Sequence, residues 1–508
     1  MNQDDNMQTN TPGADNSGQS APDLFNRTVK GGMWVFALRM LIQLLSSAKW
    51  IVLVKWLAFM DFGLIGIADL TMQALSTFTT TGFQAALIQK KKQTHDFLDT
   101  AWTIGIIRGV LLFVIIYFIA PLAARLKVDP EQFQLTVNII RILGFCLILD
   151  AVSNIGTIYF RKDLKFNKQF IFEIVSSVIN ITITISIAVI YRSVWAIVIG
   201  KLIGSVTKCV ISYWIHPYRP KFKVDLAKAR ELWGFGKWIF ALSVLGFIIK
   251  TGDDCFVWGY LGVISLGLYR ISYRFAMAPA TEISNVISQV TFPAYSKFQD
   301  DIPRLRNAYL KVLEFTAFLS IPLAGFIFAL TRSFIVLFRK EELLPIILVM
   351  QILAFRGMIY SIGATRGPLF QSVGQPRLGT VIKLVKLFIL ACLIYPLTKR
   401  FGLVGTAWSI VIADTAVQPL AFYFSVRVIS CHPWRMLKPI ILPFVATCTM
   451  IAAIYLLKVY LPEDNFVSFF GLALTGGCVY IVTVWILDRL GGGTLKKNIY
   501  SQLGTLAK

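Results

Sequence analysis

Long apolar runs, separated by short polar segments, follow one another along most of this 508-residue chain. Most of them extend for about 20 residues or more, which as a helix is enough to cross a hydrocarbon core about 30 Å thick. Six runs lie near residues 31–55, 62–88, 101–124, 137–160, 170–191 and 194–215. Six more lie near 232–258, 261–292, 308–331, 344–371, 377–398 and 402–425, and a last pair near 438–460 and 466–488. The pattern predicts an all-α polytopic membrane protein with about fourteen transmembrane helices.

The first run is echoed by the seventh. Trp34-Val-Phe-Ala-Leu-Arg39 returns as Trp238-Ile-Phe-Ala-Leu-Ser243, 204 residues later, and the same register matches Gly63-Leu64 with Gly267-Leu268. Because six spans separate the two copies, both enter the membrane in the same direction, as in the parallel repeats of many secondary transporters. We therefore expect two six-helix pseudo-symmetric lobes, with the functional cavity between them.

These patterns divide the chain into six parts. Residues 1–26 are polar and lack the basic and apolar regions of a signal peptide, so we expect a disordered cytoplasmic tail. The other expected parts are an N-terminal lobe at 27–216, a basic connector at 217–230, a C-terminal lobe at 231–430, two additional transmembrane helices at 431–490 and a cytoplasmic tail at 491–508.

The composition agrees with a membrane protein, since 56% of the residues are hydrophobic and only 15% are charged. The formal net charge of +23 would suggest a nucleic-acid partner in a soluble protein, but the excess of Lys and Arg on cytoplasmic loops explains it here, so no nucleic acid is expected. Loops rich in Lys and Arg alternate with poorer ones at a ratio of roughly two to one, which places both termini in the cytoplasm.

Metal and cofactor chemistry is not indicated. The seven cysteines are scattered without a CxxC spacing, and His95, His216 and His432 stand singly near the predicted loop edges. We expect no metal site and no cofactor.

Charged residues inside the predicted spans are the candidate functional residues. A charge at the bilayer centre costs about 2.5 to 3.5 kcal/mol on insertion scales, so such side chains normally face a protein interior or a wet cavity. The candidate substrate-binding cations are Arg39, Lys49, Lys250, Arg270, Arg274, Arg356 and Arg366; the candidate ion-coupling acids are Asp253, Asp254 and Asp414. Structural pairing between such cations and acids is the alternative for each of them.

Spacing ranks the cations. Arg270 and Arg274 share a helical face. Arg270, Arg274, Arg356 and Arg366 have no acid within one helical turn, so we expect them to be free to bind an anion in one cavity. Lys250 lies within one helical turn of Asp253 and Asp254, so these acids could neutralise its charge.

Several motifs in residues 28–425 resemble those of a known family, the polysaccharide transporter branch of the multidrug/oligosaccharidyl-lipid/polysaccharide exporter superfamily, close to Wzx-type O-antigen and colanic acid exporters. The motifs are Asp61-Phe-Gly-Leu-Ile-Gly-Ile-Ala68, Gly82-Phe-Gln-Ala-Ala-Leu-Ile-Gln89, Arg161-Lys-Asp-Leu-Lys-Phe166, Leu266-Gly-Leu-Tyr269 and Phe292-Pro-Ala-Tyr-Ser296. The resemblance implies a MATE-like fold in a bacterial inner membrane. It also implies transport of undecaprenyl diphosphate-linked oligosaccharides for exopolysaccharide or lipopolysaccharide synthesis, with a polysaccharide polymerase and a chain-length regulator as partners.

Two other functions are alternatives to this one. A cation-coupled multidrug exporter of the same fold should line its cavity with acids and aromatic residues, whereas this chain has an excess of intramembrane Arg and Lys. A membrane polymerase or glycosyltransferase needs a general base or acidic metal ligands on a sizeable loop, but no loop here much exceeds about 20 residues. We therefore expect a transporter rather than an enzyme.

Overall fold

The computed structural model describes residues 41–78, 95–125, 128, 130–162, 166–225, 244, 246–296, 298–338, 341–462 and 465–490, and these residues contain helices and no strand. The first part of the chain forms the helix 41–56, α2 (Phe59–Phe78), α4 (His95–Arg125), α5 (Pro130–Val152), η1 (Ile155–Thr157), α6 (Ile158–Lys162), α7 (Phe166–Tyr191) and α8 (Trp195–Ile215). We call residues 41–215 the N-lobe.

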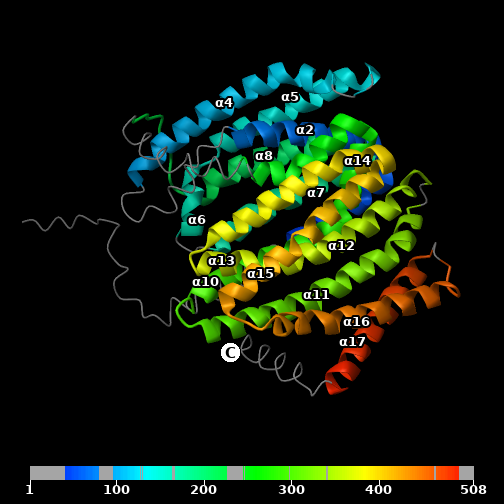
Figure 1. Cartoon of the computed structure of the whole chain (residues 1–508). Helices are drawn as coiled ribbons and strands as arrows, with labels where there is room; N and C mark the ends of the chain where they lie inside the picture. The colour runs from blue at the N-terminus through cyan, green and yellow to red at the C-terminus, as the bar shows by residue number, and fades with distance from the viewer. Residues whose placement is uncertain are drawn as a thin grey trace, which may run out of the picture.

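The second part begins with the helix 246–261 and continues with α10 (Val263–Ser296), α11 (Ile302–Val336), η2 (Glu341–Leu343), α12 (Ile346–Ala364), α13 (Arg366–Ser372), α14 (Pro376–Ala416) and α15 (Gln418–Ile429). We call residues 246–429 the C-lobe. It is followed by α16 (Pro433–Lys458) and α17 (Phe466–Leu490). In Figure 1, α4 and α5 form one edge of the bundle, and α16 and α17 form the opposite edge.

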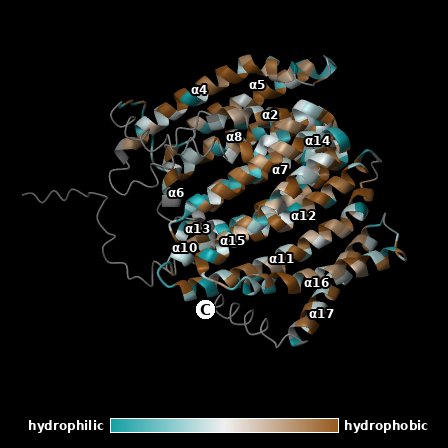
Figure 2. Cartoon of the chain, in the orientation of Figure 1, coloured by the Kyte–Doolittle hydropathy of each residue, from teal (hydrophilic) through white to brown (hydrophobic). Residues whose placement is uncertain are grey.

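The helices have the length and composition that a membrane requires. Nine of the described helical segments satisfy a strict criterion of length and hydropathy, and the helix ribbons in Figure 2 carry many residues coloured as hydrophobic. One of the nine, Pro376–Ile429, is too long for a single crossing. It is divided at Gly402, whose φ of 58° and ψ of −137° are not helical. This break matches the predicted end of one span at 398 and start of the next at 402.

The two halves of α14 then fold back on each other. A Cβ atom on Gly405 would lie 2.0 Å from the carbonyl oxygen of Leu397, and the hydroxyls of Thr398 and Thr406 are 2.9 Å apart.

The helices described above confirm the predicted all-α membrane fold. The total of about fourteen spans and the exact lobe boundaries stay predictions consistent with it.

The two lobes meet where α2 packs against α10. A Cβ atom on Gly63 would lie 2.2 Å from the backbone oxygen of Val263, and a Cβ atom on Gly267 would lie 2.2 Å from the backbone oxygen of Phe59. Only glycine permits backbones this close. The repeat's other anchors, Trp34–Arg39 and Trp238–Ser243, lie outside the described residues.

The start of the connector is fastened to the N-lobe. The Asp99 carboxylate in α4 accepts a hydrogen bond from the Tyr218 hydroxyl at 2.6 Å and another from the backbone N–H of Lys221 at 2.8 Å. The amide of Asn154 donates to the carbonyl of Tyr218 at 2.6 Å, and the Phe222 ring packs on Trp102. Residues 216–225 are therefore attached to the N-lobe by hydrogen bonds and a ring contact.

Candidate functional site

A series of charged side chains links the two lobes inside the bundle. In the first part, Asp69 on α2 lies between Lys201 on α8 and Arg270 on α10, and Arg270 also faces Asp254. In the second part, Asp253 faces Arg356 on α12, and Asp414 on α14 pairs with both Arg356 and Lys386. The neighbouring acids Asp253 and Asp254 thus have partners in two different groups.

The first group joins the N-lobe to the C-lobe. Asp69 Oδ1 lies 2.5 Å from Lys201 Nζ, and Asp69 Oδ2 lies 3.4 Å from Arg270 Nη2. Arg270 Nε lies 3.9 Å from Asp254 Oδ2. Arg270 and Asp69 stand roughly 10 and 15 Å along their helices from the ends at Val263 and Phe59, at a rise of about 1.5 Å per residue. These charges are therefore well inside the bundle.

Two more cations lie in the same region. Arg274, one turn after Arg270, donates from Nη2 to Ser46 Oγ at 2.5 Å, and its guanidinium lies 5.6 Å from the ring centre of Trp50. Lys49 donates to Asn180 Oδ1 at 3.1 Å, and the same amide donates to the carbonyl of Gly200, next to Lys201. We call Lys49, Asp69, Lys201, Arg270 and Arg274 the interlobe cluster.

The second group lies within the C-lobe, and we call Asp253, Arg356, Lys386 and Asp414 the C-lobe network. Arg356 Nε lies 3.1 Å from Asp414 Oδ2, and Arg356 Nη1 lies 3.8 Å from Asp253 Oδ2. The Tyr269 hydroxyl donates to Asp253 at 2.8 Å. Two cations face two acids, so the network is electrically balanced.

Exposure separates the two groups. The side chains of Lys201, Asp69 and Arg270 are 37%, 23% and 21% exposed, whereas those of Arg356, Asp414 and Lys386 are 6%, 10% and 14% exposed. The interlobe cluster holds four cations and one acid of its own, Asp69, while Asp254 near Arg270 and Glu282 near Arg274 offset part of the remaining positive charge. The interlobe cluster is therefore more accessible than the C-lobe network.

The structure separates the four arginines that spacing ranked first. Arg270 and Arg274 reach the N-lobe from one face of α10, as predicted, but Arg356 lies in the C-lobe network. Arg366, ten residues and about 15 Å of helix beyond Arg356, donates from Nη1 to Gln418 Oε1 at 2.6 Å. The expectation that all four lack acidic partners is wrong for Arg270 and Arg356. Their partners come from other helices, which spacing along one helix cannot reveal.

The expected pairing of Lys250 with its own helix is also wrong. Asp253 and Asp254 pair with Arg356 and Arg270, and the side chain of Lys250 is exposed. A buried acid can pair with a basic side chain on a neighbouring packed helix. It does not pair here with the exposed lysine one turn away on its own helix. Arg39, the remaining candidate, lies outside the described residues.

Lys201 and Asp69 complete the interlobe cluster, although spacing along single helices did not rank either of them. Each stands in an apolar run, which marks it as an intramembrane charge. Their pairing, across 132 positions of sequence, carries no local signal.

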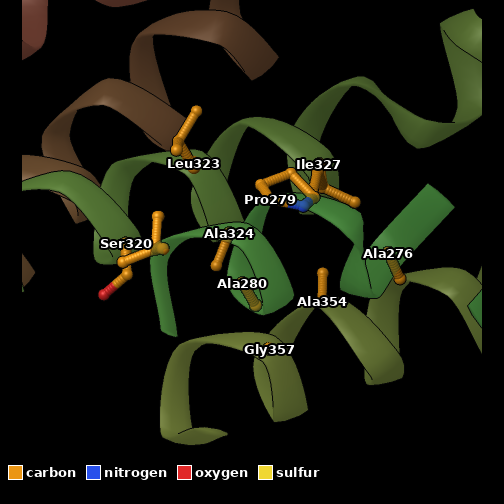
Figure 3. A pocket seen from close by; sticks show the side chains of 10 residues that line it. Ala276, Pro279, Ala280, Ser320, Leu323, Ala324, Ile327, Ala354 and Gly357 are labelled. Atoms are coloured by element: carbon orange, nitrogen blue, oxygen red, sulfur yellow. The ribbon is translucent and has the colours of Figure 1, made fainter. Parts of the chain in front are cut away.

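A small apolar hollow lies elsewhere, among α10, α11 and α12 in the C-lobe (Figure 3). Its ten lining residues include Ala280, Ser320 and Gly357 but no charged residue. It therefore offers nothing to hold an anion. Within the described ranges, no group of three or more His, Cys, Asp or Glu side chains is placed to hold a metal ion.

The fold is that of a polytopic membrane protein with charged side chains inside its helical bundle. The chain superposes on the lipid II flippase MurJ in an inward closed conformation with a TM-score of 0.72 and 18% identity, over 90% of this chain and 99% of that one. The likeness confirms the predicted fold.

Residues 52–347 match the polysaccharide biosynthesis protein family, and the chain belongs to that family. It is 25% identical over 467 residues to an uncharacterized membrane protein in the cps region of Klebsiella pneumoniae, covering 91% of this chain and 95% of the relative. It is 22% identical over 441 residues to the lipopolysaccharide biosynthesis protein WzxC of Escherichia coli strain K12, covering 86% and 89%. The predicted kinship with polysaccharide exporters is confirmed.

Proposed function

We propose that this protein is a flippase that moves undecaprenyl diphosphate-linked oligosaccharides across a bacterial inner membrane for exopolysaccharide or O-antigen synthesis. The observation that carries the proposal is the interlobe cluster, in which cations from the helix 41–56, α8 and α10 converge inside the bundle. Membership of the polysaccharide biosynthesis family supports the substrate class.

The cluster suits a diphosphate group. Such a group loses much of its water when it enters the membrane, and fixed cations can replace that hydration. Arg270 and Arg274 each present a planar guanidinium that binds two oxygens at once, and Lys49 and Lys201 add two point charges. In this proposal the diphosphate binds these four side chains while the lipid tail stays in the bilayer and the sugars occupy the space between the lobes.

The lobes would expose the cluster to each side of the membrane in turn. With both termini in the cytoplasm, the turns before α2 and after the helix 246–261 face the outside. The close contacts of Gly63 and Gly267 then lie on the outer side of the cluster and separate it from the outside. Transport requires this contact to part and an inner contact to form.

The C-lobe network is our proposal for the coupling site. Asp253 and Asp414 share Arg356, and Asp254 contacts Arg270 of the interlobe cluster. A proton or cation taken up by any of these acids would free a guanidinium and so change the charge balance in both groups. Arg366, through Gln418, which donates to the carbonyl of Asp414, belongs to the same neighbourhood.

The multidrug exporter of the same fold is the alternative. An excess of fixed positive charge at the lobe interface repels cationic drugs, and this favours the anionic lipid-linked substrate. A polymerase and a chain-length regulator remain the proposed protein partners, since they act on the same polymer.

The test is to delete the gene in its own host and to measure surface polymer, lipid-linked repeat units and drug sensitivity together. The proposed function predicts loss of polymer and accumulation of lipid-linked units on the cytoplasmic side. Normal polymer with increased sensitivity to cationic drugs would support the exporter and reject the flippase.

A further inference from the structure

Asp69 occupies the position that an anionic ligand would take in the interlobe cluster. Its two carboxylate oxygens lie 2.5 Å from Lys201 Nζ and 3.4 Å from Arg270 Nη2. Lys201 belongs to the N-lobe and Arg270 to the C-lobe. The carboxylate therefore neutralises one cation from each lobe and also ties the lobes together.

The surroundings let Arg270 lie directly against α2. A Cβ atom on Gly66 would be 3.0 Å from Arg270 Nη1 and 2.9 Å from the side chain of Leu266. Any larger side chain at residue 66 would push the guanidinium away from Asp69. Arg270 Nη1 is itself buried, and no hydrogen-bond partner for it exists among the described residues. The guanidinium has an unused donor beside Asp69.

A diphosphate can replace this carboxylate. Both groups accept charge-assisted hydrogen bonds from Lys and Arg, but a diphosphate carries more charge and offers more oxygens, so it can engage the fork of Arg270 and the ammonium of Lys201 together. The side chains of Lys201 and Asp69 are 37% and 23% exposed, so the ligand can reach this ion pair while the pair is still formed.

We propose that Asp69 is a placeholder that keeps Lys201 and Arg270 in position while the transporter is empty, and that the diphosphate of the substrate displaces it. This inference rests on the proposed function. Displacement removes the ion pair between Asp69 and Arg270, so loading the substrate also loosens one tie between the lobes. Asp69 is then a positioning residue that acts through the two cations.

A purely structural ion pair makes the opposite prediction. If Asp69 only stabilises the fold, its removal leaves two misplaced cations and weakens or does not change ligand binding. If it is a placeholder, its removal eliminates a competitor, so the ligand binds more tightly.

The experiment uses the full-length protein in lipid nanodiscs and undecaprenyl diphosphate as the probe. Asp69→Asn should bind the probe about fivefold more tightly than the wild type, equivalent to about 1 kcal/mol. Arg270→Gln and Lys201→Gln should both bind it less tightly. Asp150→Asn is the matched control, because Asp150 pairs with Lys208 at 4.0 Å elsewhere in the N-lobe. It should bind like the wild type.

A second measurement needs no variant. Carboxylate footprinting by mass spectrometry on the wild type should show that the probe increases labelling of Asp69 and leaves that of Asp150 unchanged. If the wild type binds the probe but Asp69→Asn is no tighter, or if Asp69 becomes no more reactive, the placeholder role is rejected. If the wild type does not bind the probe at all, the proposed function fails as well.

Discussion

Gly63 and Gly267 occupy equivalent positions of the two repeats and lie at the same contact between the lobes. Each would place a Cβ atom 2.2 Å from a backbone oxygen of the opposite helix, Gly63 from Val263 and Gly267 from Phe59. Phe59 and Val263 are themselves 204 residues apart, as are the two glycines. The contact is thus symmetric, because α2 of the N-lobe packs against α10, the corresponding helix of the C-lobe.

The first prediction concerns this contact. Gly63→Ala or Gly267→Ala should force α2 and α10 apart, because the obstructing atoms are backbone, at a cost of about 1 to 3 kcal/mol. We expect a lower melting temperature in detergent and reduced transport. Gly105→Ala is the control, since no atom lies within 4 Å of a Cβ added there. It should be neutral or stabilising. Equal stability of all three variants would contradict the symmetric contact.

The second prediction separates charge from shape at Arg270 and Arg274. Replacing either with Ala should abolish most transport, whereas Lys should restore part of it, because Lys keeps the charge but loses the planar fork. Transport is measured as surface polymer at matched membrane levels of protein. Lys variants as active as the wild type would show that bidentate contacts are not required.

The third prediction concerns the C-lobe network. Asp414→Asn leaves Arg356 and Lys386 facing Asp253 alone, and an uncompensated buried charge costs about 3 to 5 kcal/mol. The melting temperature should therefore fall. Adding Lys386→Met restores the balance and should recover part of the loss in a double-mutant cycle. Strictly additive losses would contradict the description of these residues as one network.

The fourth prediction concerns the fastened connector. Burial, and then the nearby carboxylate of Asp99, raise the pKa of the Tyr218 phenol above its usual value of 10.0. The neutral phenol is thus favoured in the folded state, and its contribution to stability is complete below pH 10 and is lost as the pH rises further. Tyr218→Phe should cost about 0.5 to 1.5 kcal/mol at neutral pH.

The pH dependence gives the decisive comparison for the connector. Between neutral pH and strongly alkaline pH, the wild type should lose more melting temperature than Tyr218→Phe, which has no phenol to ionise. Parallel curves for the two proteins would mean that the hydrogen bond to Asp99 contributes no stability.

The fifth prediction is the topology. Reporter fusions at Gly18 and after Gly493 should both report the cytoplasm, because the loops on that side carry the excess of Lys and Arg. An outward signal at either position would reverse the orientation on which the outward-closed description rests.

The fold was predictable from the sequence because hydropathy and helix breaks depend on residues that are close together in the chain. The end of one span and the start of the next around Gly402, and the matched Gly63 and Gly267, are visible in the printed chain and recur in the structure. The i,i+4 spacing of Arg270 and Arg274 likewise gave their common direction.

The pairing of charges was not predictable in the same way. Asp69 meets Lys201 and Arg270 only because α2, α8 and α10 converge, and the neighbours Asp253 and Asp254 turn to different partners because they project in different directions from one helix. Spacing along a single helix ranked Arg356 as free, while folding placed it against two acids.

We propose that the interlobe cluster carries the anionic part of the substrate across the membrane. The most direct measurement compares a variant with Lys49, Lys201, Arg270 and Arg274 all replaced by Gln with a control in which the exposed cations Arg377, Lys399, Arg400 and Arg435 are replaced by Gln. Surface polymer and lipid-linked repeat units are measured in cells that hold each protein at the wild-type membrane level. We predict loss of polymer and accumulation of lipid-linked units for the cluster variant alone. Normal polymer from the cluster variant would show that these four cations do not carry the substrate.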